Sequence, residues 1–154
     1  MRAGRGAAIL GARGDGDRSD GGWLRGMAEL TLRAVGRAHP DTVWFRYTSF
    51  RQWPAWSPQI VRVETRDERI GPGARGTIRS FLGVRAAFLV ESVDDERRTW
   101  TWRVRLGPLR MRLTHEVRPH RDGTETRLGM QGPAPVLAAY APLARLALRR
   151  LLTP

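Results

Sequence analysis

Apolar and polar residues begin to alternate at Met27, and this alternation predicts a half-buried β-strand. Leu30, Leu32 and Ala34 fall on one side of the segment, while the residues between them are polar or charged. Successive side chains of a strand point to opposite faces, so one face should meet the core and the other solvent. The sequence His39-Pro40-Asp41 ends the pattern, because proline and its neighbours favour a turn or the start of a helix.

Two short helices are predicted directly after this strand. Asp41 is a favourable N-cap residue, and residues 42–48 carry Trp44 and Tyr47 at helical spacing. A second short helix is expected over residues 50–56. The chain therefore turns away from the first strand before the next strand begins.

Six further strands and one long helix are predicted in the rest of the chain. The strands cover residues 59–68, 74–82, 85–93, 98–107, 109–118 and 124–131. Short connections such as Gly107-Pro108 and Asp122-Gly123 indicate antiparallel neighbours. The last helix covers residues 133–152, and its apolar stripe consists of Val136, Tyr140, Leu143, Ala147 and Leu151. Together these elements indicate an α+β fold.

Residues 1–26 differ in composition from the rest of the chain. They are rich in glycine, arginine and aspartate and contain few large apolar side chains, a composition that buries too little surface to offset the loss of chain entropy. We expect a disordered tail here and one folded domain over residues 27–154. We also hypothesise that Met27 is the physiological start, which an intact mass of the native protein beginning at Met1 would contradict.

The net charge of +12 and the 27 basic residues, all of them arginine, raise the question of nucleic-acid binding. The arginines are dispersed, however, and in predicted strands they occupy alternate positions, as in Arg103 and Arg105. This spacing is typical of a solvated sheet face, so no nucleic acid is expected as a partner. A basic face of the last helix, formed by Arg145, Arg149 and Arg150, leaves open binding to nucleic acid or anionic membranes. Only binding that weakens steeply with salt would support that possibility.

Several kinds of site are absent from the sequence. There is no cysteine, which excludes thiolate catalysis, disulfides and cysteine-type zinc sites. We also find no metal-ligand cluster, nucleophile elbow, phosphate-binding glycine loop or pair of inward carboxylates, so neither a metal nor another cofactor is expected. His39 and His120 lie beside prolines in predicted loops and are interpreted as surface residues. No apolar stretch is long enough to span a bilayer, and a cytoplasmic location is expected.

The order of the elements and several motifs resemble the START-like superfamily, also called SRPBCC, and specifically its bacterial polyketide cyclase/dehydrase and lipid-transport branch. The resemblance covers residues 27–154. It rests on the segment DTVWFRYTSFRQWPAWSPQIVRVE, the glycine turn IGPGARGTI, the strand RTWTWRV, the motifs LTHEV and DGTET, and the proline-led last helix. It implies a helix-grip fold, in which a curved seven-stranded antiparallel sheet wraps the C-terminal helix around a cavity. Because this fold serves carriers, receptors and cyclases alike, function must be argued from the cavity residues.

Large apolar side chains are predicted to line this cavity. Alternation places Trp100 and Trp102 on one face of their strand and Met111 at a facing position of the next. The candidate ligand-binding residues are Trp44, Trp53, Trp56, Phe81, Phe88, Trp100, Trp102, Met111, Met130 and Tyr140. Most of these side chains are expected to be ordinary core, but as a set the flat rings and adaptable methionines suit an apolar ligand pocket. The segment WPAWSP, residues 53–58, is either a plug that fixes the short helices or a gate at the cavity mouth.

His115 and Arg79 are the candidate catalytic residues. His115 interrupts an inward apolar row, where a neutral imidazole needs a hydrogen bond to the protein or to a ligand. No inward carboxylate is predicted to orient it, because Glu116 points the other way by alternation. Arg79 and Ser80 follow the glycine turn, and the register leaves open which of them faces inward. An inward arginine would stabilise an enolate or hold a carboxylate, as the resemblance to cyclases implies.

Two functions follow from such a cavity. The first is binding of a hydrophobic small molecule, such as a lipid, quinone or polyketide, by a carrier or sequestering protein. The second is an aromatase/cyclase-type enzyme that uses His115 for proton transfer and Arg79 for anion stabilisation, without metal or covalent chemistry. In either case the partner is a hydrophobic ligand, and the protein is expected to be a monomer or a homodimer.

Overall fold

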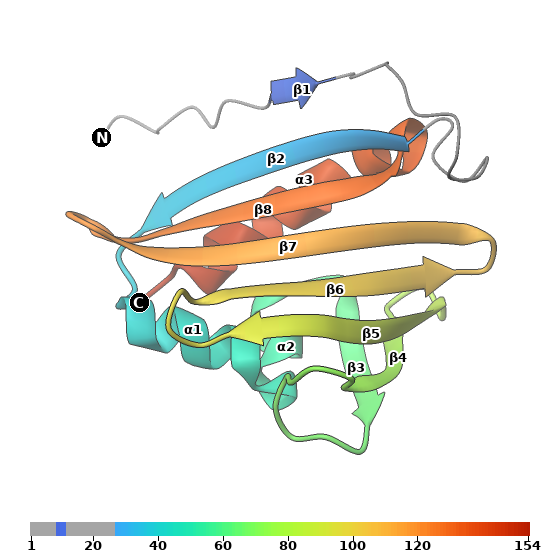
Figure 1. Ribbon diagram of the computed structural model, residues 1–154, viewed down its shortest axis with the longest axis horizontal. Helices are drawn as coiled ribbons and strands as arrows, with labels where there is room; N and C mark the ends of the chain where they lie inside the picture. Colours follow the sequence, from blue (N-terminus) through green and yellow to red (C-terminus); the bar gives the residue numbers. More distant parts are fainter. Residues whose placement is uncertain (1–8, 12–26) are drawn as a thin grey trace.

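One antiparallel sheet and the helix α3 (Ala134–Leu151) form the frame of the molecule (Figure 1). The computed structural model describes residues 9–11 and 27–154. The strands are β1 (Ile9–Gly11), β2 (Met27–Gly36), β3 (Ile60–Thr65), β4 (Arg75–Ser80), β5 (Arg85–Asp94), β6 (Thr99–Leu106), β7 (Leu109–His120) and β8 (Gly123–Pro133). They lie in the order β1-β2-β8-β7-β6-β5-β4-β3. The predicted helix-grip architecture, with seven strands β2–β8 around the last helix, is confirmed.

Strand β1 adds an eighth strand at the edge of the sheet. It pairs antiparallel with β2, so that Leu10 lies opposite Leu30. The rest of the predicted tail, residues 1–8 and 12–26, lies outside the described residues. The disordered tail therefore stays a prediction for those two ranges.

Two short helical segments follow β2, as predicted, but their bounds differ. The helix α1 spans Pro40–Thr48, and its N-cap residue is His39 rather than Asp41. The Nδ1 atom of His39 accepts a hydrogen bond from the backbone N–H of Asp41 at 3.1 Å. The backbone N–H groups of the first helical turn have no partner within the helix, so the missing N–H of a proline costs nothing there. Pro40 is therefore the first residue of the helix, which begins earlier than predicted. The second segment consists of a 3₁₀ turn, η1 (Phe50–Gln52), and the helix α2 (Trp53–Trp56).

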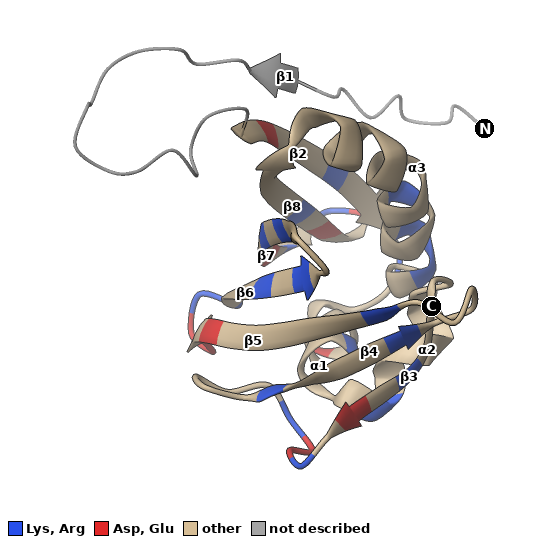
Figure 2. Cartoon of the chain, turned by 90° about the vertical axis from the view of Figure 1, so that its right-hand side faces the viewer, with Lys and Arg blue, Asp and Glu red and all other residues tan. Residues whose placement is uncertain are grey.

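The helix α3 lies over β2 and β8, inside the curve of the sheet (Figures 1 and 2). Its buried residues are Leu137, Ala141, Ala144, Ala147, Leu148 and Leu151. The predicted apolar stripe is only partly buried, because Val136, Tyr140 and Leu143 are half-exposed. These three line a cavity instead of packing on the sheet. The helix therefore carries two apolar faces, one toward the sheet and one toward the cavity.

The helix α1 joins the end of α3 to the sheet. The guanidinium of Arg46 donates to the backbone carbonyls of Leu151 at 2.7 Å and Thr153 at 2.6 Å. The hydroxyl of Tyr47 lies 3.0 Å from the hydroxyl of Thr126 on β8. These contacts close one end of the fold, since they tie the first helix to the last helix and the last strand.

The outer face of the sheet carries arginine–glutamate pairs. Arg103 and Arg112 pair with Glu91 at 2.7 and 3.2 Å, and Arg33 pairs with Glu125 at 2.5 Å. Figure 2 shows basic positions spread over several strands and α3 rather than gathered in one place. Arginines at alternate strand positions therefore lie on the solvated face, as the sequence predicted.

Gly76 of β4 lies where the neighbouring strand β3 approaches closely. A Cβ atom there would overlap the backbone oxygen of Glu64 and lie 3.0 Å from the ring of Phe88. We expect Gly76→Ala to lower the free energy of unfolding by about 1–3 kcal/mol, because overpacking forces the strands apart. Gly71→Ala is the matched control, since no atom lies within 4 Å of its Cβ position. Guanidinium chloride unfolding measures both, and equal losses would contradict the prediction.

Candidate functional site

Tryptophan rings from α2 and β6 form one wall of the site. Trp53 packs against Trp102 with ring centroids 5.1 Å apart, and Trp100 stacks on Trp102 at 5.3 Å. The indole N–H groups of Trp53 and Trp56 donate to backbone carbonyls of α1 at 2.9 and 3.1 Å. These bonds fix the rings to the first helix. These hydrogen bonds favour the interpretation of residues 53–58 as a plug that fixes the short helices, rather than as a gate at the cavity mouth.

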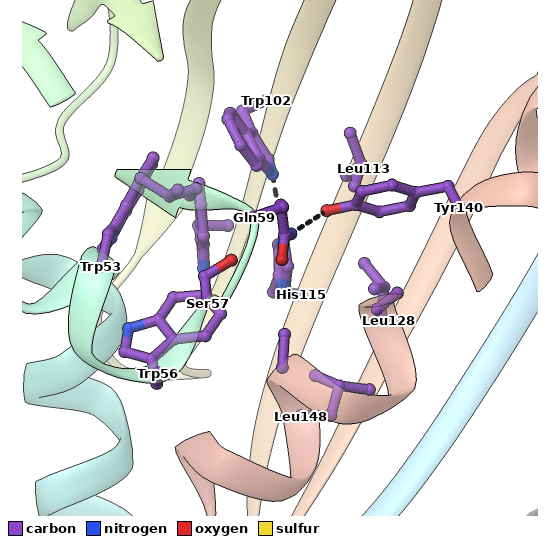
Figure 3. Close-up of a pocket in the computed structure, with 14 residues that line it drawn as sticks. Trp53, Trp56, Ser57, Gln59, Trp102, Leu113, His115, Leu128, Tyr140 and Leu148 are labelled. Atoms are coloured by element: carbon purple, nitrogen blue, oxygen red, sulfur yellow. Dashed lines mark hydrogen bonds between the residues drawn. The ribbon is translucent and has the colours of Figure 1, made fainter. Parts of the chain in front are cut away.

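A small recess lies between these rings, α3 and the strands β6–β8, and we call it the inner recess (Figure 3). Its volume is about 20 Å³, which suffices for one group of the size of a water molecule. It is lined by Trp53, Trp56, Ser57, Gln59, Ile60, Trp100, Trp102, Leu113, His115, Leu128, Tyr140, Ala144, Ala147 and Leu148. No aspartate, glutamate, arginine or lysine is among them.

A larger apolar space adjoins the inner recess, and we call it the outer cavity. Its volume is about 220 Å³, and it lies between α3 and the strands β4–β7. It is lined by Gln59, Ile60, Ile78, Ser80, Val84, Ala86, Trp102, Val104, Leu106, Leu109, Met111, Leu113, Val136, Tyr140 and Leu143. Both spaces are lined by Gln59, Ile60, Trp102, Leu113 and Tyr140, so the two are neighbours.

His115 of β7 is a buried side chain of the inner recess that carries a titratable ring. It is 4% exposed and stacks on Trp100 with ring centroids 4.4 Å apart. Its Nε2 atom accepts a hydrogen bond from the indole N–H of Trp102 at 2.9 Å (Figure 3). This contact confirms the prediction that an inward imidazole would be hydrogen-bonded.

The hydrogen bond from Trp102 also fixes where the imidazole of His115 carries its proton. An indole nitrogen can only donate, so Nε2 is unprotonated and the proton of the neutral ring sits on Nδ1. Among the described residues Nδ1 has no hydrogen-bond partner, and it is buried. Burial lowers the pKa of His115 to about 3, because desolvation disfavours the charged ring. At neutral pH the side chain is therefore an unpaired donor rather than a proton acceptor.

Gln59 and Tyr140 form a second polar pair at the boundary between the two spaces (Figure 3). The amide nitrogen of Gln59 donates to the hydroxyl of Tyr140 at 2.7 Å, which leaves the amide oxygen buried and unpaired. The indole nitrogen of Trp100 is also buried without a partner in the described part of the chain. Burial raises the pKa of Tyr140 to about 12, so its hydroxyl keeps its proton at neutral pH.

Arg79 lies on the outer side of β4, away from both spaces. Its Nε atom is 2.5 Å from a carboxylate oxygen of Glu64 on β3, and its side chain is 39% exposed. Ile78 and Ser80 line the outer cavity instead. Of the two possibilities that the sequence left open, Ser80 faces inward, and Arg79 has no access to an anion inside the cavity.

The predicted ligand-binding residues divide into two groups. Those that line the recess or the cavity are Trp53, Trp56, Trp100, Trp102, Met111 and Tyr140. Trp44 instead donates to the carboxylate of Asp95 at 3.1 Å, and Phe88 and Met130 are core residues. Phe81 is 57% exposed and follows Ser80, the last residue of β4. The alternation of the strand therefore does not extend to it. Alternation identifies the inner face of a strand but does not separate core from cavity.

Sequence reasoning missed Gln59 as a site residue. It stands directly after the segment WPAWSP, at the first position of the predicted strand 59–68, where a single polar side chain does not indicate an inward position. Val136 and Leu143 were assigned to the apolar stripe of the last helix, and only the packing of α3 over β2 and β8 turns them toward the cavity.

The part of the chain that the structure describes contains no candidate metal site. No three histidine, aspartate or glutamate side chains in residues 9–11 and 27–154 are close enough to hold a metal ion. Among the same residues, no helix is both long and apolar enough to cross a membrane. The polar groups that line the two spaces are hydroxyl, amide, indole and neutral imidazole groups.

The lowered pKa of His115 predicts that stability falls on mild acidification. The unfolded chain binds a proton at this residue near pH 6.5 and the folded protein only near pH 3, so stability is lost as the pH falls through that window. We expect a loss of about 2 kcal/mol between pH 7.5 and pH 5.0. Hydrogen bonds from Arg33 and Arg127 lower the pKa of Glu125 to about 2. The contribution of Glu125 to the free energy of unfolding is therefore lost at more acidic pH than that of His115.

His115→Gln is the control for this pH dependence, because it lacks a titrating group at this position. Its free energy of unfolding should change much less over the same interval. Denaturant unfolding at the two pH values measures both proteins. An equal drop in the wild type and the variant would show that other groups cause the effect.

Solved structures share this fold at low sequence identity. Protein MLL2253 from Mesorhizobium loti has a TM-score of 0.68 and 17% identity, and the match covers 80% of this chain and 93% of that one. The crystal structure of Ara h 8.0201 has a TM-score of 0.67 and 10% identity, with 82% and 95% covered. Protein CV1439 from Chromobacterium violaceum has a TM-score of 0.63 and 16% identity, with 80% and 94% covered. These similarities establish the fold alone.

Sequence comparison adds the family. No curated protein matches the chain. Residues 27–153, however, match the family described as "Polyketide cyclase / dehydrase and lipid transport". The match runs from the first residue of β2 to the penultimate residue of the chain. The chain therefore belongs to the polyketide cyclase/dehydrase and lipid-transport family of the START-like superfamily.

Proposed function

We propose that the outer cavity and the inner recess together bind one hydrophobic small molecule, and that the protein carries or sequesters this molecule rather than converting it. The observation that carries the proposal is the apolar outer cavity of about 220 Å³ between α3 and β4–β7. An apolar cavity of about 150 Å³ already accommodates benzene in another protein. The space is therefore large enough for an apolar ligand of more than one ring or for part of a longer chain.

The lining of the outer cavity supports an apolar ligand. Aliphatic side chains from β5, β6, β7 and α3 surround it, including Val104, Leu109 and Leu143. Met111 adds a flexible thioether, which adapts to ligands of different shape. Apolar walls with a few placed polar groups are the usual composition of small-molecule sites.

The chemistry of the site favours binding over the alternative, an aromatase/cyclase-type enzyme. His115 has a pKa of about 3, and its Nε2 is occupied by Trp102, so it is a poor proton acceptor at neutral pH. Arg79, the candidate anion stabiliser, pairs with Glu64 outside the cavity. Tyr140 keeps its proton at neutral pH and serves as a donor of hydrogen bonds rather than as a base. Both predicted catalytic groups thus lack the properties that a cyclase would need.

Filling the outer cavity should abolish binding. Ala86 lines the cavity, whereas its neighbour Ala87 on the same strand is exposed on the opposite face. We expect Ala86→Phe to lose affinity for the apolar probe 2-ethylnaphthalene, because the new ring occupies the space of the probe. Ala87→Phe, the matched control, should bind the probe as the wild type does. Equilibrium dialysis measures the dissociation constants.

Native mass spectrometry provides a second measurement with the same variants. A hydrophobic ligand retained from the expression host should add mass to the wild type and to Ala87→Phe but not to Ala86→Phe. Equal binding by Ala86→Phe and Ala87→Phe in the dialysis experiment would contradict the location of the site. The absence of any probe binding by the wild type would contradict the proposed function itself.

A further inference from the structure

We infer that the inner recess binds a neutral carbonyl oxygen at one end of the hydrophobic ligand, so that the ligand enters with this end first. The inference rests on the proposed function, since it assigns a chemical group to the same ligand. It makes the inner recess the part of the site that determines specificity and leaves the outer cavity to hold the apolar remainder.

Unpaired polar groups are concentrated at the inner recess. In the described part of the chain, four buried side-chain nitrogen or oxygen atoms lack a hydrogen-bond partner, namely Gln59 Oε1, Arg79 Nε, Trp100 Nε1 and His115 Nδ1. Three of them belong to side chains that line the recess, and the fourth lies beside Glu64 at 2.5 Å. Each buried group without a partner destabilises a protein by about 1–3 kcal/mol, so native structures contain few of them. Three at one place indicate a missing partner.

Two of these three groups, Trp100 Nε1 and His115 Nδ1, are donors and call for an acceptor, whereas Gln59 Oε1 is itself an acceptor. The indole of Trp100 can only donate, and His115 carries its proton on Nδ1 because Nε2 accepts from Trp102. The hydroxyl of Tyr140 accepts from Gln59 and still has its own hydrogen to donate. A carbonyl oxygen has two lone pairs and no hydrogen, and it therefore suits a site in which donors outnumber acceptors.

The recess also favours a neutral group over an anion. No arginine or lysine lines it, and His115 is uncharged at neutral pH. A carboxylate placed there would lose its hydration without gaining a cation as its partner. A ketone, aldehyde or ester carbonyl loses far less hydration and gains the same hydrogen bonds.

The volumes set the direction in which the ligand lies. The inner recess of about 20 Å³ has room for one oxygen-sized group, whereas the outer cavity of about 220 Å³ holds a much larger body. The two spaces share Trp102, Leu113 and Tyr140 as lining residues. A ligand that reaches both must pass between these side chains with its narrow polar end toward His115.

A pair of matched probes tests the inference. 2-Acetylnaphthalene and 2-ethylnaphthalene have nearly the same shape, but only the first has a carbonyl oxygen. The ratio of their dissociation constants, measured by equilibrium dialysis, should favour the ketone in the wild type. We expect His115→Gln to reduce this ratio by roughly fivefold to tenfold, the effect of one neutral hydrogen bond, because glutamine can replace Nε2 as acceptor for Trp102 but not the Nδ1 donor. The affinity for 2-ethylnaphthalene should stay unchanged.

Two further variants keep the test independent of the behaviour of His115→Gln. Tyr140→Phe removes one hydroxyl from a half-buried position on α3 and should also lower the ratio. Phe81→Ser, in the exposed turn outside both spaces, should not change it. Near-ultraviolet circular dichroism verifies that each variant is folded.

The outcomes separate this inference from the proposed function. If both probes bind the wild type and the ratio is the same in all variants, the recess holds only water and the inference is wrong, while the proposed function stands. If neither probe binds the wild type, the proposed function fails. A ratio that falls in His115→Gln and Tyr140→Phe but not in Phe81→Ser supports the carbonyl site.

Discussion

A single helix cannot cover the whole face of an eight-stranded sheet, and most features of this protein follow from that constraint. The helix α3 lies over β2 and β8, where Leu137 and Leu148 are buried. The aromatic rings of η1 and α2 cover a further part of the face through contacts such as Trp53 with Trp102. Between the rings and the helix, the outer cavity of about 220 Å³ remains against β4–β7. The cavity is therefore a consequence of the same packing that stabilises the fold.

The polar groups of the site are held by strand register. The register of β6 and β7 places Trp100 opposite His115 and Trp102 opposite Leu113. The indole of Trp102 therefore reaches His115 along the diagonal of the ladder, while the ring of Trp100 stacks on the imidazole. Neither ring can turn without breaking one of these contacts. Groups that are fixed before a ligand arrives lose little conformational freedom when it binds.

The sequence predicted the elements of the fold better than the site, for physical reasons. Regular alternation and short connections were sufficient to predict the strands β2–β8 and the antiparallel neighbours among β3–β8, because a meander with such connections has few alternatives. The position of β2 beside β8 does not follow from these patterns. The N-cap was assigned to Asp41, since side-chain capping by His39 has no strong sequence signal.

The site depends on distances between elements, which alternation does not contain. Arg79 and Ser80 differ by one position, and the choice between them required the register of β4 with β3, which contains an irregularity near Arg62. The place of Gln59 in the site depends on its hydrogen bond to Tyr140 of α3, a residue far away in the sequence. The sequence indicated His115 because it is a polar residue in an apolar row. The position of its proton depends on the hydrogen bond from Trp102, and no sequence pattern indicates that bond.

The pairing of the first long strand with the last has a consequence for synthesis. β2 pairs along its whole length with β8, from Met27 opposite Pro133 to Gly36 opposite Thr124, and α3 follows β8 directly. During translation β2 therefore lacks its long partner strand until β8 (Gly123–Pro133) has left the ribosome. The strands β3–β7 emerge earlier as a meander whose apolar face is not yet covered by α3. The nascent chain thus exposes the future ligand cavity as an open apolar surface, the kind of surface that chaperones bind.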